Sequence, residues 1–388
     1  MDLSLNQAEA AFKAELRSWL VANVPSSPLP DPEAVGNLDA QRAWEKRLFE
    51  AGYGAMHWPR EYGGQGANLF FELMFQDEYV RAGGPKRVNI IGLDLVGPTL
   101  IAHGTADQKL RWLPKILTCE HVWSQGFSEP NAGSDLASVA TTAERDAGDF
   151  IVRGQKIWTS LGRFADWIFC LVRTDRTVSR HRGLSFIMID LRSPGVEVRP
   201  ILQINGAAGF AEVFFTDVRV PEANIIGTVN DGWRVAMTTL GFERGLTNAS
   251  PAYYSQTVTD LGALVGASER DDDEVLQDRV IASYIRSRVY RHSVMRLITR
   301  LDEGDVIGAE ASLLKLFWSE MEVEIYETGI EAMGDRAEAK PGARGALDPG
   351  RWQSSYWRSR ATKIFSGTNE IQKNVVSERL LGLPREPR

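Results

Sequence analysis

The feature of this sequence that most constrains its fold is a change of hydrophobic pattern, from helical to strand-like and back to helical. In residues 1–121 apolar side chains recur every three or four positions, most clearly over 8–20, which is typical of helices with one buried face. Residues 122–232 hold short runs of β-branched and aromatic residues separated by glycines, which predicts strands joined by turns. Helical periodicity returns over 233–388, in long stretches at 233–266, 274–302, 306–333 and 352–380. The pattern therefore predicts a mixed α+β chain in the order α, β, α.

Composition and charge narrow the range of partners. The 388 residues include 44 Lys and Arg against 51 Asp and Glu, which gives a formal net charge of -7. A mild acidic excess gives no reason to expect nucleic acid or an anionic membrane as partner. The apolar runs are far shorter than the roughly 18 residues of a membrane span, and the charged start of the chain is unlike a secretory signal. The sequence therefore predicts a cytoplasmic protein without a membrane span.

Several common chemistries are unlikely because their motifs are missing. The sequence has no G-x-x-x-x-G-K-[ST] loop, no G-x-G-x-x-G, no H-E-x-x-H and no G-x-S-x-G. Its five histidines are scattered, and its two cysteines lie in no C-x-x-C motif. We therefore predict no metal site, and a nucleotide, if bound, is held without these loops.

Five other motifs occur in a fixed order along the chain. They lie at 97–114, 124–135, 154–160, 216–227 and 367–384. The second reads S-Q-G-F-S-E-P-N-A-G-S-D, the third reads G-Q-K-I-W-T-S, and the fifth begins G-T-N-E-I-Q. Together they resemble the acyl-CoA dehydrogenase family, whose members carry E-P-x-A-G-S-D and G-x-K-x-W-x-[ST] in the same order.

The resemblance implies a three-part fold and a reaction. The parts are an N-terminal α-helical domain (1–121), a middle β-barrel domain (122–232) and a C-terminal helical bundle domain (233–388). Family members bind FAD and oxidise an acyl-CoA to the 2,3-enoyl-CoA. A base removes the α-proton while the β-hydride passes to flavin N5, and an electron-transfer flavoprotein reoxidises the flavin.

The resemblance also implies which residues contact FAD. Motif by motif, the cofactor-binding set is Gln125, Gly126, Phe127, Ser128, Ser134, Trp158, Thr159, Ser160, Thr368 and Glu370. Backbone and hydroxyl groups of the second motif line the cofactor, Trp158 stacks on the flavin ring, and Thr368 and Glu370 reach it from the C-terminal domain. Each residue has an ordinary structural alternative, since a Trp in a strand is more often core and Gly-Ser-Asp is more often a turn.

The catalytic base is expected on a different segment from that of straight-chain family members. Those members place a Glu in a Y-E-G-T segment near the C-terminus, whereas this chain has F-S-G-T at 365–368. The isovaleryl and long-chain enzymes carry it in an L-x-x-E-R pattern after the barrel, matched here by L-G-F-E-R at 240–244. The resemblance therefore assigns Glu243 as the base, the alternative being an ordinary surface charge. The implied substrate contacts are Ser134, Arg244, Ser366 and Gly367.

Two departures from the family pattern lead to further expectations. Ser in place of Glu at 366 removes bulk beside the acyl chain, which favours a branched or sterol-like acyl group. The motifs R-x-x-F-G and Q-x-x-G-G-x-G, which grip the FAD adenosine across a subunit interface, are degraded at 268–274 and 331–335. We therefore expect a heterotetramer with a second acyl-CoA dehydrogenase-like subunit that supplies these motifs. An arginine-rich stretch over 279–300 is interpreted as a solvated or subunit-facing helix flank.

Two other functions remain open at the level of sequence. A flavin monooxygenase or nitroalkane-type oxidase of the same fold would use a different base and react with oxygen. A non-catalytic or FAD-completing partner subunit would typically lack a carboxylate at both base positions. The Glu at 243 argues against both alternatives.

Overall fold

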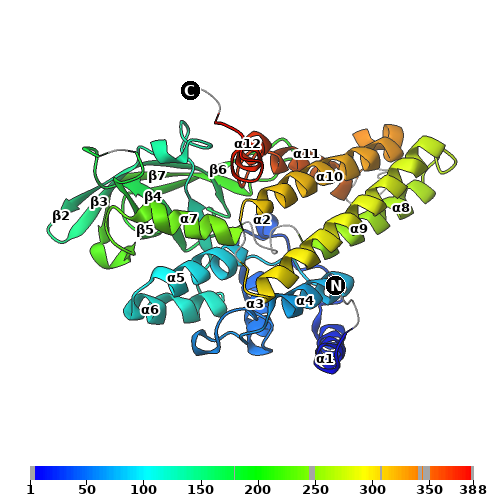
Figure 1. The fold of residues 1–388 in the computed structure, drawn as a ribbon, viewed down its shortest axis with the longest axis horizontal. Coiled ribbons are helices and arrows are strands. Elements are labelled where there is room, and N and C mark those ends of the chain that lie inside the picture. Colours follow the sequence, from blue (N-terminus) through cyan, green and yellow to red (C-terminus); the bar gives the residue numbers. More distant parts are fainter. Residues whose placement is uncertain are drawn as a thin grey trace. The chain divides into compact units, whose positions relative to one another are not determined.

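The structure is a computed structural model that describes residues 5–178, 180–243, 250–305, 308–339, 343 and 350–385. The chain divides into two compact units, whose elements can be followed by colour in Figure 1. One unit, here called the sheet unit, comprises 25–67 and 85–243. The other, the bundle unit, comprises 1–24, 68–84 and 244–388.

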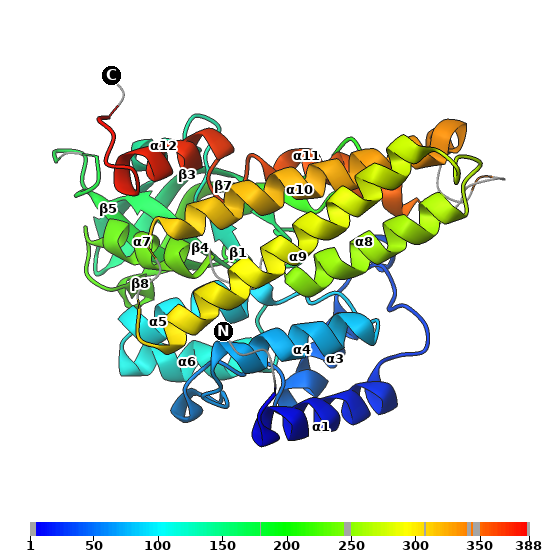
Figure 2. The ribbon, with the colours of Figure 1, turned by 45° about the vertical axis from the view of Figure 1, so that its right-hand side comes forward.

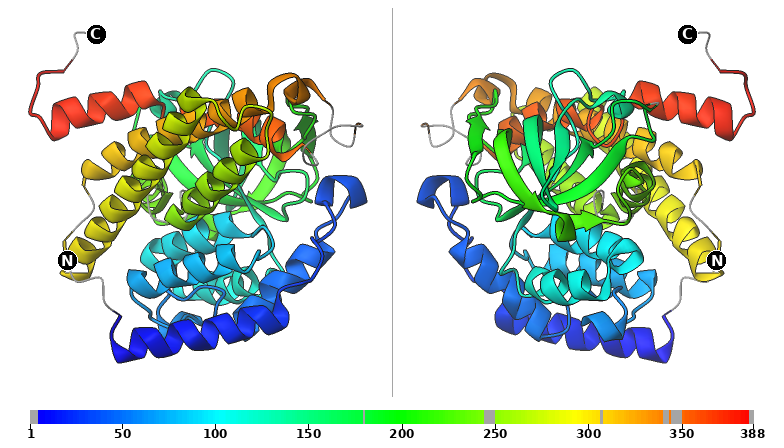
Figure 3. Two further views of the ribbon diagram at one scale, coloured as in Figure 1. Left: turned by 90° about the vertical axis from the view of Figure 1, so that its right-hand side faces the viewer. Right: turned by 90° about the vertical axis from the view of Figure 1, so that its left-hand side faces the viewer.

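The sheet unit is built around one eight-stranded sheet. Its strands are β1 (Trp123–Gly126), β2 (Thr142–Asp146), β3 (Asp149–Ser160), β4 (Trp167–Arg173), β5 (Leu184–Asp190), β6 (Val196–Ile201), β7 (Phe210–Pro221) and β8 (Ile225–Ile226). They follow the order β6-β7-β3-β2-β4-β5-β8, with β1 pairing in parallel with β4. Figure 3 shows the strands curving around a common interior. Strands β4 and β5 are buried along nearly their whole length, because apolar residues fill both faces.

The sheet unit also contains helices. They are α2 (Pro32–Val35), α3 (Asp39–Glu50), α5 (Gly97–His103), α6 (Ala106–Leu117) and α7 (Gly232–Glu243), with a π-helical turn η2 (Ile91–Val96) before α5. Helix α6 begins at a complete capping box, in which Thr105 and Gln108 satisfy each other's backbone N–H groups. Helix α7 packs on β5 and α5. Their core includes Trp112, Trp123 and Trp167, whose ring centroids lie 5.6–6.2 Å apart.

The bundle unit is helical. Its helices are α1 (Gln7–Asn23), α4 (Leu69–Arg81), α8 (Pro251–Gly266), α9 (Glu274–Asp302), α10 (Glu310–Met333), α11 (Arg351–Thr362) and α12 (Asn369–Arg379). Figure 2 shows α8, α9 and α10 side by side, and α10 also contacts α11 and α12. Leu261, Leu276 and Met321 are among the fully buried residues of their shared core. Helix α10 is therefore the central element of this unit.

The observed elements bear on two expectations. The mixed α+β class is confirmed, with the strands confined to the middle of the chain. The division into three domains at 121 and 232 remains a prediction, because the two compact units follow spatial contacts and join segments from different parts of the chain. Among the described residues no helix is long and apolar enough to cross a membrane, and no group of three or more His, Cys, Asp or Glu could hold a metal ion.

Candidate active site

A buried ion pair fixes the loop that follows β1. The Nζ atom of Lys156 lies 2.7 Å from Glu129 Oε1 and donates a second hydrogen bond to the Leu171 carbonyl. The Glu129 carboxylate also accepts the backbone N–H groups of Ala140 and Thr141, at 2.6 and 2.9 Å. Burial alone would raise the pKa of Glu129, but the ammonium and these donors outweigh it and hold the pKa below its ordinary value. The loop is therefore locked to β3.

Trp158 projects from β3 at an irregularity in the sheet. Its backbone is left-handed, with φ of 60°, and the register between β3 and β7 shifts between Lys156 and Thr159. Such irregularities re-aim side chains, and Trp158 as a residue is 56% exposed, whereas large aromatic residues are usually well buried. An exposed indole on a rigid strand offers a flat surface on which a planar aromatic group can stack.

The two residues after Trp158 lie closer to the interior. Thr159 is fully buried, and its Oγ1 has no hydrogen-bond partner among the residues that the structure describes. Because an unpaired buried hydroxyl costs about 1–3 kcal/mol, this atom marks a place where a ligand can supply the missing bond. The Ser160 carbonyl accepts a hydrogen bond from Ser124 Oγ at 2.8 Å, which ties β3 to β1.

The residues at the start of the second motif, 125–128, have different surroundings. Gln125 is half-buried on β1. Gly126 pairs with Cys170, and a Cβ at this glycine would lie 2.6 Å from the Cys170 Sγ, so packing alone requires glycine here. The Phe127 ring is buried in the core, which leaves only its backbone for a ligand. The Ser128 carbonyl accepts a backbone N–H of β3 at 2.9 Å. The structure therefore brings 125–128 and 158–160 together.

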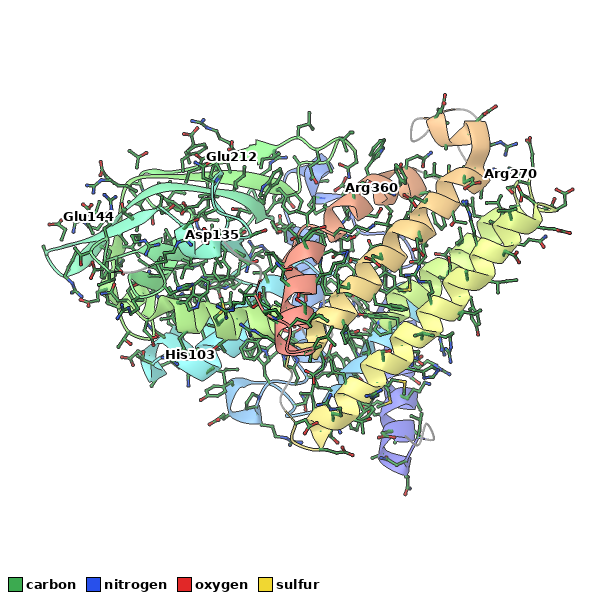
Figure 4. All side chains as sticks on the ribbon, turned by 45° about the horizontal axis from the view of Figure 1, so that its top comes forward. His103, Asp135, Glu144, Glu212, Arg270 and Arg360 are labelled. Carbon is green, nitrogen blue, oxygen red and sulfur yellow. The ribbon has the colours of Figure 1, made fainter. Side chains whose placement is uncertain are left out.

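Ser134 lies on an exposed turn that neighbouring side chains hold in place. The next residue, Asp135, forms an ion pair with Arg180 in the connection between β4 and β5; Figure 4 labels Asp135. Arg173 donates a hydrogen bond to the Ala137 carbonyl at 2.8 Å, just after the turn. The Ser134 side chain is exposed, so its hydroxyl is accessible to a ligand.

Helix α7 carries the predicted base at its last residue. One turn earlier, the fully buried Thr239 places its Oγ1 2.9 Å from Thr99 Oγ1 of α5. His103 of α5, labelled in Figure 4, bonds a neighbouring threonine of α7 at 2.9 Å. These two bonds fix the rotation of α7 about its axis. The side chain of Glu243 and the whole of Arg244 lie outside the described residues, so their roles remain predictions.

In the bundle unit, the predicted contacts lie on the turn between α11 and α12. Ser366 and Gly367 are both left-handed, with φ of 55° and 82°. The side chain of Gln372 holds this conformation, because its Nε2 donates to both of their carbonyls at 3.1 and 3.4 Å. Thr368 is the N-cap of α12, and its Oγ1 accepts the Ile371 N–H at 3.2 Å. The Thr368 hydroxyl therefore has a structural task independent of any cofactor.

A buried lysine anchors this turn from α10. Lys315 Nζ lies 2.7 Å from Asn369 Oδ1, which also accepts a hydrogen bond from Ser319 Oγ at 3.0 Å. Burial lowers the pKa of Lys315 to about 8. Glu370 is exposed in the first turn of α12, and its own backbone N–H, with the Thr368 hydroxyl, holds its pKa below the ordinary value. The structure therefore brings 366–370 together within the bundle unit.

Sequence reasoning missed the residues that support both sets of contacts. Glu129 and Lys156 lie inside two of the quoted motifs, yet no role was assigned to either of them. The signal that marks Lys156 is its place in the alternation of β3, where it has the same parity as the buried Phe150 and Val152, because buried charges are rarely left unpaired. For Lys315 and Asn369, 54 residues apart, the sequence offers no comparable signal.

Ion pairs occupy the region where the family's adenosine-gripping motifs are degraded. Arg270 donates to the Glu331 carbonyl at 3.0 Å, and the Glu331 carboxylate pairs with Arg279. Arg336 pairs with Glu269 at 2.6 Å. Figure 4 places Arg270 at the end of the bundle where α8 passes to α9. The loop before α9 and the end of α10 are thus tied to each other within the chain.

Comparison with known proteins adds family information to this geometry. The chain matches family models for the acyl-CoA dehydrogenase N-terminal domain over 6–120, middle domain over 124–218 and C-terminal domain over 230–381. Acyl-CoA dehydrogenase IpdE1 of Mycobacterium tuberculosis is 40% identical over 387 residues, covering 97% of this chain and 98% of that protein. Acyl-CoA dehydrogenase FadE26 of the same organism is 32% identical, with both chains fully covered.

Solved structures show the same similarity in three dimensions. A chain of the ChsE4–ChsE5 complex from Mycobacterium tuberculosis superposes with a TM-score of 0.86 at 31% identity, with both chains fully covered. A chain of the Tcur3481–Tcur3483 steroid acyl-CoA dehydrogenase gives a TM-score of 0.87 at 28% identity, again with full coverage of both. The whole length of this chain is therefore similar to dehydrogenase subunits.

Proposed function

The chain belongs to the acyl-CoA dehydrogenase family, and we propose that it introduces a 2,3 double bond into an acyl-CoA thioester with FAD as cofactor. The observation that carries this proposal is the platform of 125–160, where a buried ion pair supports an exposed indole and an unpaired buried hydroxyl. When bound there, FAD supplies the acceptor for the substrate's β-hydride.

We propose a contact with FAD for each residue of the platform according to the groups that the residue presents. Trp158 presents a face on which an isoalloxazine ring can stack. Thr159 Oγ1, buried and without a partner in the described chain, is suited to a polar edge of the same ring. Backbone groups of 125–128 and the exposed hydroxyl of Ser134 are suited to the rest of the cofactor or the substrate. Thr368 and Glu370 complete the set.

We assign proton abstraction to Glu243. The α-carbon of a thioester is a weak acid, so its deprotonation needs a positioned carboxylate and hydrogen-bond donors at the thioester oxygen. Helix α7 is rotationally fixed one turn before this residue by the bond between Thr239 and Thr99. Ser366 lacks a carboxylate, and its backbone N–H is the donor that we propose for the thioester oxygen. Arg244 and Gly367 are the remaining proposed substrate contacts.

The proposed substrate class is a bulky, ring-bearing acyl-CoA. A solved relative is described as a steroid acyl-CoA dehydrogenase, and Ser366 leaves more room than the Glu of straight-chain enzymes. A straight chain would contact the walls of an enlarged pocket poorly, and the lost contacts weaken binding. A branched or polycyclic acyl group is therefore favoured, with an electron-transfer flavoprotein as the acceptor of the electrons.

The proposed assembly is a heterotetramer with a second dehydrogenase-like subunit. Two solved relatives carry the names of two chains each, ChsE4–ChsE5 and Tcur3481–Tcur3483. In this chain the ion pairs of Glu331 with Arg279 and of Glu269 with Arg336 stand where a neighbour's adenosine would be gripped. A second subunit with the intact motifs can supply that grip.

The experiment that tests the proposal measures flavin and turnover separately. The chain, co-expressed with its genomic neighbour of the same family, is purified and its flavin absorbance recorded. Straight-chain, branched and steroid-ring CoA thioesters are then screened with an artificial electron acceptor. A flavin spectrum that bleaches on addition of a bulky thioester supports the proposal. A colourless complex, or a yellow one that no thioester reduces, would overturn it.

A further inference from the structure

Helix α10 carries a lysine whose charge is almost entirely enclosed. Lys315 as a residue is 4% exposed, and its Nζ donates a hydrogen bond to Asn369 Oδ1 at 2.7 Å. It forms no ion pair with any residue that the structure describes. Buried ammonium groups are normally paired with a carboxylate. The bundle unit therefore encloses a positive charge that no described residue neutralises through an ion pair.

The surroundings of this ammonium disfavour its charge. Ser319 of the same helix donates to the same Asn369 oxygen at 3.0 Å, so the group that accepts from Lys315 is a neutral amide. Glu320 of α10 and Glu370 of α12 attract the ammonium from beyond ion-pair distance. Burial outweighs their attraction and lowers the pKa of Lys315 to about 8. The folded chain thus holds this charge at a cost to its own stability.

The enclosed charge is joined to the turn that carries two of the proposed substrate contacts. Asn369 is the first residue of α12, so the bond from Lys315 meets the positive end of that helix. Gln372, three residues later, holds the backbone carbonyls of 366 and 367 through its Nε2. A buried cation and a helix N-terminus are therefore combined beside the turn of 366–368. Both favour negative charge at this turn.

We propose that Lys315 is a positioning residue whose ammonium, acting through Asn369 and the first turn of α12, stabilises the negative charge that develops on the thioester oxygen as Glu243 takes the α-proton. This inference rests on the proposed function, in which the backbone N–H of Ser366 donates to that oxygen. The oxygen is neutral in the bound thioester and gains charge only as the proton leaves, so the stabilisation is confined to the transition state. The buried ammonium lacks a permanent partner because its partner forms only during the reaction.

A purely structural role for Lys315 makes the opposite prediction for stability. If Lys315 only held the turn in place, Lys315→Met would lower the melting temperature. Because the native ammonium is buried without a carboxylate, an apolar side chain of similar length should leave the melting temperature unchanged or raise it. Ser319 still donates to Asn369 Oδ1 in this variant, so the amide oxygen is not left unpaired.

The direct test measures negative charge on a bound thioester without turnover. The probe is acetoacetyl-CoA, whose α-proton is acidic and whose enolate absorbs in the near ultraviolet. The flavin-loaded assembly is saturated with this probe at pH 7, where the ammonium form of Lys315 predominates because its pKa is about 8. We expect the ratio of bound enolate to bound neutral thioester to be about tenfold lower in Lys315→Met than in the native chain.

Lys373→Met is the matched control, because it removes the same charge from an exposed position on α12. Solvent screens exposed charges, so its enolate ratio should stay within about twofold of the native value. An unchanged ratio in Lys315→Met, or equal losses in both variants, would overturn the inference and leave the proposed function standing. A native assembly that does not bind acetoacetyl-CoA would contradict the proposed function, and with it this inference.

Steady-state kinetics with a thioester that is turned over give a second, independent readout. Lys315→Met should lower kcat about tenfold and leave KM within about twofold, because the stabilised charge exists only in the transition state. A raised KM with unchanged kcat would show that Lys315 serves binding of the ground state, and would overturn the proposal. So would a melting temperature several degrees below native with the enolate ratio unchanged, which is the result that a structural anchor predicts.

Discussion

The platform of 125–160 and the junction of 268–279 with 331–336 both rely on ion pairs, but with opposite consequences. In the platform, Lys156 and Glu129 are buried beneath the site and leave Trp158 exposed above. At the junction, Glu331 and Arg279 pair on the exposed surface itself. In the platform the ion pair lies below the surface and leaves that surface open to a ligand. At the junction the surface charges pair with one another instead. We therefore propose that the chain retains one half of a dehydrogenase site and lacks the other.

The largest effect is expected when the proposed catalytic base, Glu243, is removed. Glu243→Gln keeps the volume and hydrogen bonding of the side chain but removes the proton acceptor. We expect turnover to fall by roughly 10²–10⁴-fold, with flavin content and melting temperature unchanged. Steady-state kinetics and the flavin spectrum check this. A rate near wild type, or a collapse seen only in Ser366→Ala, would show that the base is elsewhere.

The support of the platform is tested by removing its buried ammonium. Lys156→Met leaves the Glu129 carboxylate buried without its partner, which typically costs about 3–5 kcal/mol of unfolding free energy. Denaturant unfolding of the full chain measures the loss. Adding Glu129→Gln should recover part of it, because the unpaired charge is gone. Arg279→Met, which removes an exposed pair, should cost at most about 1 kcal/mol; equal losses at both sites would contradict the contrast drawn here.

The ion pair of Lys156 with Glu129 predicts that stability depends on pH, with opposite signs in the native chain and in Lys156→Met. The pKa of folded Glu129 lies below its ordinary value of 4.5, so its contribution to stability is complete above that pH and is lost as the pH falls further. In Lys156→Met, burial raises the pKa instead, so acidification from pH 7 towards 5 should relieve the penalty. Melting temperatures measured from pH 7 to below 4.5 test both signs. A parallel decline in the two proteins would refute the prediction.

The smallest expected effect concerns the acyl group. With Ser at 366, a branched or polycyclic thioester should have a specific activity about tenfold or more above that of a straight eight-carbon thioester, a difference within the range that pocket fit supplies. Relative kcat/KM values give the answer. The highest kcat/KM for the straight chain would contradict the enlarged pocket, while leaving the base assignment untouched.

Local pattern predicted much of the fold. The helix over 274–302 has the bounds that its periodicity indicated, and the strands lie within 122–232, where the residue types predict them. Strand β2 was not predicted, because its charged residues, Glu144 among them, offer no apolar alternation. The pattern also joined 233–266 into one stretch, whereas the described helices are α7 and α8.

The site was predicted less completely, for a physical reason. The motifs identified the residues at the surface of the platform, because these residues lie within short stretches of sequence with a fixed spacing. The contacts beneath it join residues that are distant in the chain, such as Lys156 to Glu129 and Lys315 to Asn369. The sequence analysis treated the arginines of α9 as one group. In the structure four of them form ion pairs within the bundle unit, whereas Arg288 and Arg296 have no ion-pair partner among the described residues.

The measurement that tests the central claim most directly is the flavin content per chain, alone and after co-expression with a family member that keeps R-x-x-F-G and Q-x-x-G-G. Because FAD favours the assembly that completes its site, we expect this chain alone to purify with little flavin. The co-purified assembly should contain one FAD for every two chains, with dehydrogenase activity appearing together with the flavin. A homo-oligomer that purifies yellow, with one FAD per chain and full activity, would contradict the account.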